Sequence, residues 1–478
     1  MLKRVFLTFA ILLLTNLSAL GQVDKPMIYV CFDRGFNRDD PNDALIMLDG
    51  MTLQEIGRIP IENGRPFDMA IRNDKKTAFV TCAPADNFGL AVIDLNQQKE
   101  IRRMFVGTFL FGVEIGPKGI VYVLAEPGQL ILINPQSFQP IQTVNLPNDP
   151  LSIVFSKDEK RAYVIAQGGI GSIPELLVLD LTNNFKIIKS ISVPGAGIAS
   201  NGQILSPDER RLYIAGNNVI AVFDTERLEV IKTLPGTSST DAVQLSRDGK
   251  TLYATGPGLI AIDTDSGAII KSFEMVDGAN QFLALSPDGN LLYINDLIRT
   301  FFSIIDIRKN EFIGFGRFET SFEGLGNGIA VTGDFSIGIP PTIQVISPQL
   351  SEIVQRGKPF TIRWQTTNGG FIIGKHILEI STDGGQNFNT ILFADNLRGT
   401  AQEFQWNVPN QIISSAQIRI TAFDVGGRIG TKTSETFSIG DRPPDPIDNQ
   451  PPTVRFLNPL GGERFNQGDN LTITWSSS

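Results

Sequence analysis

The chain has 478 residues and a formal net charge of −9, from 41 Lys and Arg against 50 Asp and Glu. This length exceeds one ordinary hydrophobic core, so we expect two or more domains. The acidic balance excludes a protein that binds nucleic-acid phosphates through a basic surface. The 46 Gly and 28 Pro beside 42% hydrophobic residues indicate many short strands joined by tight turns.

The N-terminus has the pattern of an export signal. Lys3 and Arg4 precede an apolar run of about ten residues, too short to span a bilayer, and the small residues Ala19 and Gly21 follow. We therefore predict a signal peptide over residues 1–21 and a protein that is secreted, periplasmic or held at the cell surface. An uncleaved anchor is the alternative. After this segment we predict no membrane span.

An internal repeat dominates the next 300 positions. An aromatic residue within an apolar run returns every 40 to 50 residues, and each such run is followed by a second one that ends in Asp or Asn. The aromatic markers are Tyr29, Phe79, Tyr122, Tyr163, Tyr213, Tyr253 and Tyr293.

Each unit is predicted to contain four strands, written here a to d. The last unit has "QFLALS", "LLYIN", "FFSIIDI" and "EFIGFGRF", with the turn "SPDG" between strands a and b. Four antiparallel strands in about 40 residues are typical of a β-propeller blade. Seven units predict a seven-bladed propeller over residues 24–335. The first unit lacks strand a, so we expect Asn327–Asp334 to supply it and close the ring.

The pattern "LSPDG..LY", followed by an apolar strand that ends in Asp, resembles the YVTN-type propeller repeats of exported and surface proteins of bacteria and archaea. The resemblance covers most of residues 24–335 and departs from the family in the third unit, which has "IGPKG" and Asn134. It implies the fold, and it implies little about activity because propellers serve many functions.

A second repeat follows the propeller. Residues 340–367 align with 451–478 without a gap, so that Gly357 matches Gly468 and Trp364 matches Trp475. We predict an Ig-like or fibronectin-like β-sandwich over 340–440 with Trp364 and Trp406 in its core, a Pro-rich linker over 441–450, and the truncated start of a second copy over 451–478. The stretch resembles Ig-like modules of secreted bacterial proteins and of the yeast cell-wall glucan-assembly family.

The sequence holds a single His, His376, and it lies outside the propeller. A propeller without His has no Ser-His-Asp triad and no His-ligated metal. We expect His376 itself to be a surface or hairpin residue. Each strand a begins near the mouth of the channel, on the face of the b–c and d–a loops. The residues at these first positions form a ring of polar and apolar side chains that could bind a ligand, although packing explains the ring equally. They are Phe67, with Asp68 next to it, Phe111, Leu151, Asn201, Asp241, Gln281 and Asn327.

Two further features lie in the first two units. The oxygen-rich insert between residues 31 and 43 could bind Ca²⁺, and otherwise is a solvated loop with internal ion pairs. Its candidate ligands are Asp33, Asp39, Asp40 and Asp43. Cys31 and Cys82 lie at the ends of strand b in adjacent units, which in an exported protein suggests a disulfide; two separate buried thiols are the alternative.

These observations favour a non-catalytic exported scaffold whose propeller binds a protein or a glycan on the face of the b–c and d–a loops, with Ig-like spacers and no organic cofactor. The alternative is a propeller hydrolase of lactonase or glycosidase type that uses carboxylates, with or without Ca²⁺. An enzyme needs several acids that converge at the channel with shifted pKa values. The predicted mouth offers one acid, Asp241, with Asp68 nearby.

Overall fold

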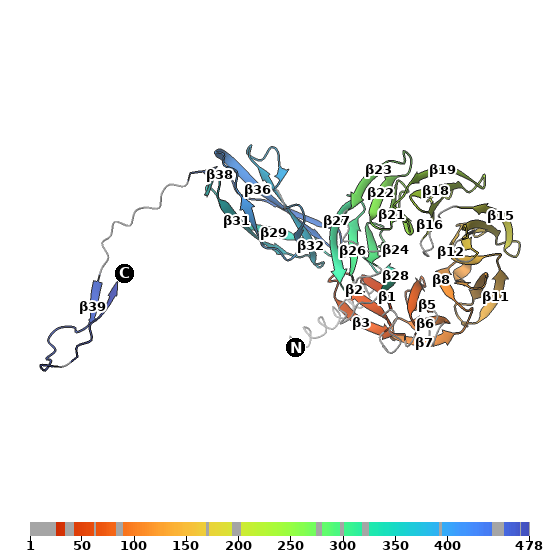
Figure 1. The fold of residues 1–478 in the computed structure, drawn as a ribbon, viewed down its shortest axis with the longest axis horizontal. Coiled ribbons are helices and arrows are strands. Elements are labelled where there is room, and N and C mark those ends of the chain that lie inside the picture. Colours follow the sequence, from red (N-terminus) through yellow and green to blue (C-terminus); the bar gives the residue numbers. More distant parts are fainter. Residues whose placement is uncertain are drawn as a thin grey trace, which may run out of the picture.

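In the computed structural model, the described residues are 25–33, 43–61, 64–82, 89–168, 172–193, 202–273, 280–296, 301–317, 325–391, 394–441, 454–468 and 470–477. Within them the chain is all-β apart from one 3-10 turn, η1 (Pro117–Gly119). Seven four-stranded antiparallel sheets stand in a ring, and further sheets follow them (Figure 1). The predicted seven-bladed propeller is therefore confirmed. The predicted signal peptide lies outside the described residues.

The blades follow the chain, and each runs from the channel outward as strands a, b, c and d. Blade one has β28 (Leu325–Thr332), β1 (Met27–Asp33), β2 (Ala44–Asp49) and β3 (Glu55–Pro60). Blade two has β4 (Pro66–Ile71), β5 (Thr77–Cys82), β6 (Gly89–Asp94) and β7 (Lys99–Met104). Blade three has β8 (Leu110–Ile115), β9 (Val121–Ala125), β10 (Gln129–Ile133) and β11 (Pro140–Asn145).

The remaining blades repeat this order. Blade four has β12 (Asp149–Phe155), β13 (Arg161–Gln167), β14 (Glu175–Asp180) and β15 (Lys186–Ser192). Blade five has β16 (Gln203–Leu205), β17 (Arg211–Ala215), β18 (Val219–Asp224) and β19 (Glu229–Pro235). Blade six has β20 (Ala242–Leu245), β21 (Thr251–Thr255), β22 (Leu259–Asp263) and β23 (Ile269–Phe273). Blade seven has β24 (Asn280–Leu285), β25 (Leu291–Asp296), β26 (Phe301–Asp306) and β27 (Glu311–Arg317).

The ring closes as predicted. β28 pairs antiparallel with β1, so that Tyr29 lies opposite Ala330 and Val30 lies opposite Ile329. The C-terminal strand of the propeller therefore completes the blade that the N-terminal strands begin. This closure gives the ring no open end at which another chain could pair.

The propeller core lies between the blades because each sheet buries both of its faces. Strand c of blade one, β2, is buried along nearly its whole length, whereas the outer strand β15 is mostly exposed. Each hydrophobic cluster joins two neighbouring sheets: Phe79 and Val92 of blade two, for example, share a cluster with Val113 and Val123 of blade three. Such near-continuous apolar strands are what a sheet covered on both faces requires.

The repeated "SPDG" phrase forms a turn, as predicted. In blade seven, Ser286 Oγ donates a hydrogen bond to Asp288 Oδ1 over 2.5 Å and accepts one from the N–H of Leu291 over 2.9 Å. Gly289 has φ of +72°, a left-handed conformation that costs glycine little. Ser156, Ser206 and Ser246 make the same pair of bonds in blades four to six. These polar residues therefore shape turns.

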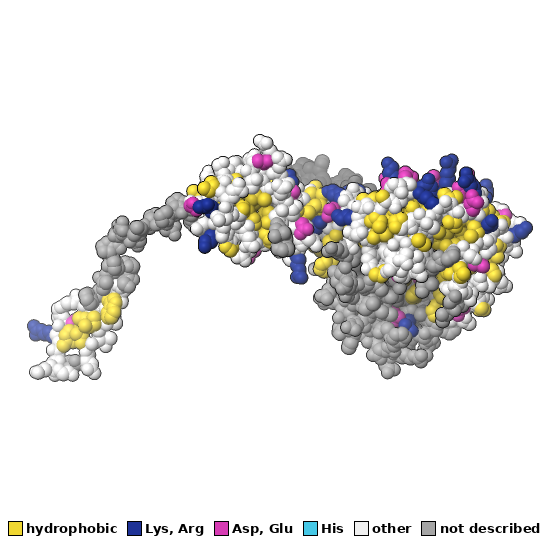
Figure 2. All heavy atoms as spheres, turned by 45° about the horizontal axis from the view of Figure 1, so that its top comes forward, with side chains coloured by type: hydrophobic (Ala, Val, Ile, Leu, Met, Phe, Trp, Pro, Cys, Tyr) yellow, Lys and Arg dark blue, Asp and Glu magenta, His cyan; other side chains and the backbone are white. Residues whose placement is uncertain are grey.

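A β-bulge interrupts the outer strand of every blade, and the bulged residue is isoleucine each time. Six of the seven are between 39% and 53% exposed, and these are Ile56, Ile101, Ile141, Ile188, Ile231 and Ile270. Ile313 of blade seven is 0% exposed. A bulge on an edge strand hinders pairing with another chain. Yellow apolar side chains are visible on the outside of the propeller in Figure 2, beside a row of Lys and Arg.

The second domain consists of two sheets. One contains β29 (Thr342–Ser347), β31 (Pro359–Thr367) and β35 (Glu403–Asn407). The other contains β30 (Ile353–Gln355), β38 (Phe437–Gly440), β36 (Ile413–Asp424), β32 (Ile373–Ser381), β33 (Asn389–Thr390), β34 (Leu397–Arg398) and β37 (Ile429–Thr433). Its own cluster includes Trp364 and Trp406, which are 1% and 5% exposed, as predicted for core residues. The finer Ig-like assignment stays a prediction.

The second domain packs firmly on blade seven, which explains why Ile313 is buried. Ile313 shares one hydrophobic cluster with Phe371, Phe423 and Val425 of the second domain. The backbones approach so closely that a Cβ added to Gly374 would lie 1.8 Å from the carbonyl oxygen of Ile313. Only glycine fits at such a contact.

Polar contacts reinforce this junction. Lys375, which is 4% exposed, donates to Glu311 Oε2 of β27 over 3.0 Å. Arg308 Nη2 bonds to the carbonyl oxygen of Gly427 over 2.8 Å, and Arg428 Nη2 bonds to that of Phe335 over 2.7 Å. The propeller and the second domain thus share apolar, ionic and backbone contacts.

A two-stranded hairpin follows at the C-terminal side, with β39 (Val454–Asn458) and β40 (Thr474–Ser477). Phe456 pairs with Trp475, as Val345 pairs with Trp364 in the second domain, so the two hairpins share a register at an offset of 111 residues. Trp475 is 62% exposed. No described helix is long and apolar enough to cross a bilayer.

Candidate functional site

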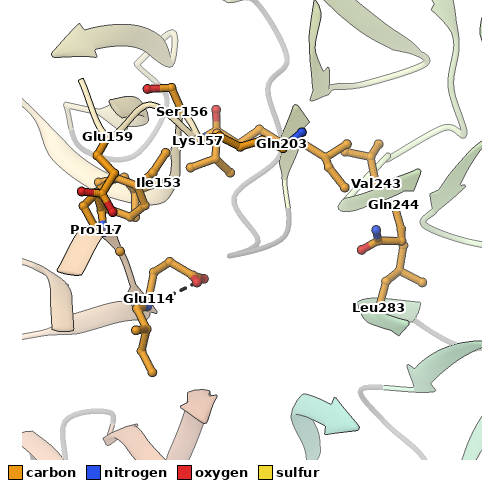
Figure 3. Close-up of a pocket in the computed structure, with 15 residues that line it drawn as sticks. Glu114, Pro117, Ile153, Ser156, Lys157, Glu159, Gln203, Val243, Gln244 and Leu283 are labelled. Carbon is orange, nitrogen blue, oxygen red and sulfur yellow. Dashed lines mark hydrogen bonds between the residues drawn. The ribbon is translucent and has the colours of Figure 1, made fainter. Parts of the chain in front are cut away.

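The propeller encloses a cavity of about 500 Å³ in its channel, at the end where the a–b turns lie. Its wall is built by strands a of blades three to seven, and Figure 3 shows side chains from these blades around one opening. A second cavity of about 110 Å³ continues along the channel, and Glu114, Ile153 and Leu283 border both. The wall of the larger cavity includes Glu114, Ile153, Gln203, Val243, Gln244 and Leu283.

This cavity lies at the opposite end of strand a from the predicted mouth. Strand a of each blade begins at the d–a loop and ends at the a–b turn, and Ser156 and Lys157 of the a–b turn of blade four line the cavity. Many residues of the b–c and d–a loops lie outside the described ranges. The predicted site at their face therefore stays a prediction.

Glu114 is the acidic side chain that sequence reasoning missed. It lies on β8, three residues after Phe111, and the matching positions of the other blades hold Ala70, Val154, Ile204, Gln244, Ala284 and Ala330. Alignment of the repeat at this position would have identified it. Glu114 and Gln244 extend toward the opening from different sides of the ring in Figure 3.

The surroundings of Glu114 perturb its ionisation. Its side chain borders the cavity and so touches water, but the ring of blades surrounds it. This enclosure raises the pKa of Glu114 to about 7, and the negative charge of Asp68 acts in the same direction. The N–H of Ile115 donates to Glu114 Oε1 over 3.3 Å and partly opposes the shift. The carboxyl group therefore changes protonation near neutral pH.

Asp68 contributes a second carboxylate to the channel. It lies on β4, is 8% exposed, and borders the smaller cavity together with Glu114. Its Oδ2 accepts a hydrogen bond from the N–H of Val113 on blade three over 3.1 Å, and its own N–H donates to Thr81 Oγ1 over 3.1 Å. The first bond links blades two and three, so Asp68 has a structural role as well as a place beside the cavity.

The other predicted mouth residues are described only in part. Leu151 is 4% exposed, the ring of Phe67 meets that of Phe282 edge-on at 6.0 Å, and Phe111 lies 4.9 Å from Phe109. Asp241 is half-buried, accepts from Ser239 Oγ over 3.3 Å, and has its pKa raised by burial. Asn201 lies outside the described residues, and of Gln281 and Asn327 only the backbone, in β24 and β28, is described.

The predicted metal ligands are only partly described. Asp33 and Asp43 are 3% and 6% exposed, and both contact Arg65: the guanidinium Nε donates to Asp33 Oδ2 over 3.1 Å and the backbone N–H donates to Asp43 Oδ2 over 2.9 Å. Asp39 and Asp40 lie outside the described residues. Among the described residues no group of three or more His, Cys, Asp or Glu could hold a metal ion. The Ca²⁺ site stays a prediction.

In the structure Cys31 and Cys82 are free, buried thiols, and the predicted disulfide between them stays a prediction. Both belong to the cluster between blades one and two. Burial raises the pKa of Cys31 well above its ordinary value and that of Cys82 to about 12, which disfavours the reactive thiolate form of both in the folded protein.

The expectation that His376 lies at the surface is wrong. It is 0% exposed in the second domain, where Nε2 lies 2.9 Å from Thr366 Oγ1 and Nδ1 lies 3.3 Å from the carbonyl oxygen of Arg398. Its ring packs against Trp364 at 5.4 Å. Burial lowers the pKa of His376, so the neutral ring serves as a hydrogen-bonded core residue. A single polar residue in a predicted strand does not indicate which face of the sheet its side chain occupies.

No family model and no curated protein matches the chain. A functionally unknown protein from Desulfotomaculum acetoxidans DSM 771 is similar in structure, with a TM-score of 0.51 and 18% identity over 65% of this chain and 99% of that one. A protein from Lactobacillus plantarum has a TM-score of 0.51 and 15% identity over the same shares. Hydrazine synthase from Kuenenia stuttgartiensis reaches a TM-score of only 0.36, at 18% identity over 56% of this chain and 71% of that one. The first two similarities support the propeller fold and say nothing about function.

Proposed function

We propose that the chain is a non-catalytic binding protein of the exported class, and that its propeller holds part of a protein or glycan partner in the channel. The second domain, an Ig-like spacer in this proposal, presents the propeller in a fixed orientation. The place of action is outside the cytoplasm, in agreement with the export signal expected at residues 1–21.

The open channel cavity carries this proposal. Its volume of about 500 Å³ falls within the range of about 300–1,000 Å³ that is usual for ligand pockets. It has room for one sugar unit or one side chain of a larger partner. Its wall alternates apolar residues such as Ile153 and Val243 with polar ones such as Gln203 and Gln244, which suits recognition of a group that is itself both polar and apolar.

The firm junction with the second domain supports the spacer part of the proposal. A domain attached only through a flexible linker would not bury Ile313 or bring Gly374 against the backbone of β27. Because apolar and ionic contacts combine at this junction, we propose that the two domains move as one body and that the channel faces a constant direction.

The test is an array of glycans and peptides probed with the full chain and with Gln244→Trp. Gln244 is half-buried and extends into the opening, so a tryptophan there is expected to fill the cavity without disturbing the core. Thr143→Trp, at an exposed position on the outer strand β11, is the matched control. We expect array signals that the first variant loses and the second keeps. Signals that survive Gln244→Trp would place binding elsewhere and contradict the proposal.

A hydrolase remains the second candidate, because Asp68 and Glu114 border the same channel. A carboxyl group with a pKa of about 7 is suited to act as a general acid near neutral pH, and a neighbouring carboxylate is the partner that such catalysis uses. Turnover on a panel of lactones and glycosides that Glu114→Gln abolishes would favour the hydrolase over the binding protein.

A further inference from the structure

We infer that the group held in the channel cavity is a cationic hydrogen-bond donor, namely a guanidinium or an ammonium. The inference rests on the proposed function, since it names the chemical class that the same cavity accepts. It follows from the charges of the cavity wall and from a buried acceptor of Gln203 that has no hydrogen-bond partner among the described residues.

Two polar side chains of the wall, Lys157 and Ser156, donate hydrogen bonds within the protein. Lys157 donates through Nζ to the carbonyl oxygen of Pro207 and through its backbone N–H to Glu209 Oε1 over 2.7 Å. Ser156 donates through Oγ to Asp158 Oδ1 over 2.7 Å. These bonds hold the a–b turns together and leave the cation of Lys157 directed at a neighbouring blade.

Gln203 provides an independent observation. This side chain lines the cavity and is only 4% exposed. Its Nε2 donates to Ser152 Oγ and to the carbonyl oxygen of Tyr163, both over 3.0 Å, so both of its N–H bonds are used. Its Oε1 has no hydrogen-bond partner in the part of the chain that the structure describes. A buried acceptor left without a donor costs about 1–3 kcal/mol. The Oε1 atom has almost no accessible surface, so a ligand gains this bond only where its entry turns the amide toward the cavity.

The charges of the channel act in the same direction. The acidic side chains on the two cavity walls are Asp68, Glu114 and Glu159, against the single cation of Lys157, which is already paired. Opposite charge on a ligand would favour the ionised form of Glu114, whereas a second anion would be repelled by it. A cation that enters near neutral pH is therefore expected to displace a proton from Glu114, whose pKa is about 7.

Three matched probes test the inference on the full chain: N-acetylarginine amide, which is cationic, its neutral isostere N-acetylcitrulline amide, and the anionic N-acetylglutamate amide. Calorimetric titration at pH 7 in two buffers of different ionisation enthalpy measures both affinity and proton release. We expect the arginine probe to bind about tenfold tighter than the citrulline probe, as loss of one charge-assisted bond implies, and to release a proton.

The variants separate the possible outcomes. Glu114→Gln is expected to abolish both the preference for the arginine probe and the proton release, and Glu226→Gln, an exposed acid on the turn after β18, is expected to change neither. If the citrulline or glutamate probe binds equally well and Gln244→Trp removes this binding, the cavity is a ligand site but the cationic class is wrong. If no probe binds, the inference fails, and the array experiment decides the proposed function on its own.

Discussion

Replacing Ile313 with alanine is expected to loosen the junction between the propeller and the second domain, whereas the same change at Ile270 is expected to have little effect. The two residues occupy the same bulge position in adjacent blades, and they are 0% and 47% exposed. Replacing a fully buried isoleucine with alanine costs about 2–5 kcal/mol, because apolar contact is lost and a cavity remains. At an exposed site the change usually stays within about 0.5 kcal/mol.

The composition of the chain provides separate probes for the two domains. All three Trp, at positions 364, 406 and 475, lie outside the propeller, and all six Tyr lie within it. During urea unfolding, tryptophan fluorescence therefore follows Trp364 and Trp406 of the second domain, above the signal of the exposed Trp475 in the C-terminal hairpin, and tyrosine absorbance follows the propeller. With the junction intact, we expect the two signals to change at the same urea concentration.

In Ile313→Ala we expect the tryptophan transition to move to lower urea and to separate from the tyrosine transition. The free energy of unfolding of the second domain should fall by about 2–5 kcal/mol, the cost of the buried substitution. Because two domains are present, each transition is fitted separately. If Ile313→Ala is no more destabilising than Ile270→Ala, or if the tryptophan and tyrosine transitions still coincide, the junction does not stabilise the second domain.

Three further expectations follow from close contacts and shifted pKa values. Gly374→Ala should separate the tryptophan and tyrosine transitions more strongly than Ile313→Ala, since its methyl group would overlap the carbonyl oxygen of Ile313; coincident transitions would contradict this. Cys31 and Cys82 should resist a thiol reagent in the folded protein, and both should react with it in urea without reductant. If neither thiol reacts in urea, the two residues form a disulfide. For Glu114, the pKa of about 7 lies above the ordinary 4.5, so the stability associated with its protonated form is present at low pH and lost as the pH rises through 7. Glu114→Gln should therefore gain stability relative to the native chain between pH 5 and pH 8, as measured by urea unfolding at both pH values; an unchanged difference would place Glu114 in an ordinary aqueous setting.

The propeller could be predicted from the sequence because the residue patterns that specify its turns and strands are local and repeated. A turn such as that of Ser286, Asp288 and Gly289 needs particular residue types within six positions, and an apolar strand needs an apolar run. Seven copies of the same local pattern predicted seven blades, and the missing strand a of blade one indicated how the ring closes. The burial of Trp364 and Trp406 followed in the same way from alternating strands.

Contacts between distant segments were decided only by the tertiary structure. Ile270 and Ile313 occupy the same position of the repeat, yet one is exposed and the other is buried where the second domain packs on blade seven. Glu114 and Asp68 border the same cavity because of the way blades two and three are arranged around the channel. Whether Cys31 reaches Cys82 depends on the spacing of two sheets, and whether His376 faces inward depends on which side of β32 the core occupies. Such distances and directions are set by the packing of whole sheets, which no short stretch of sequence encodes.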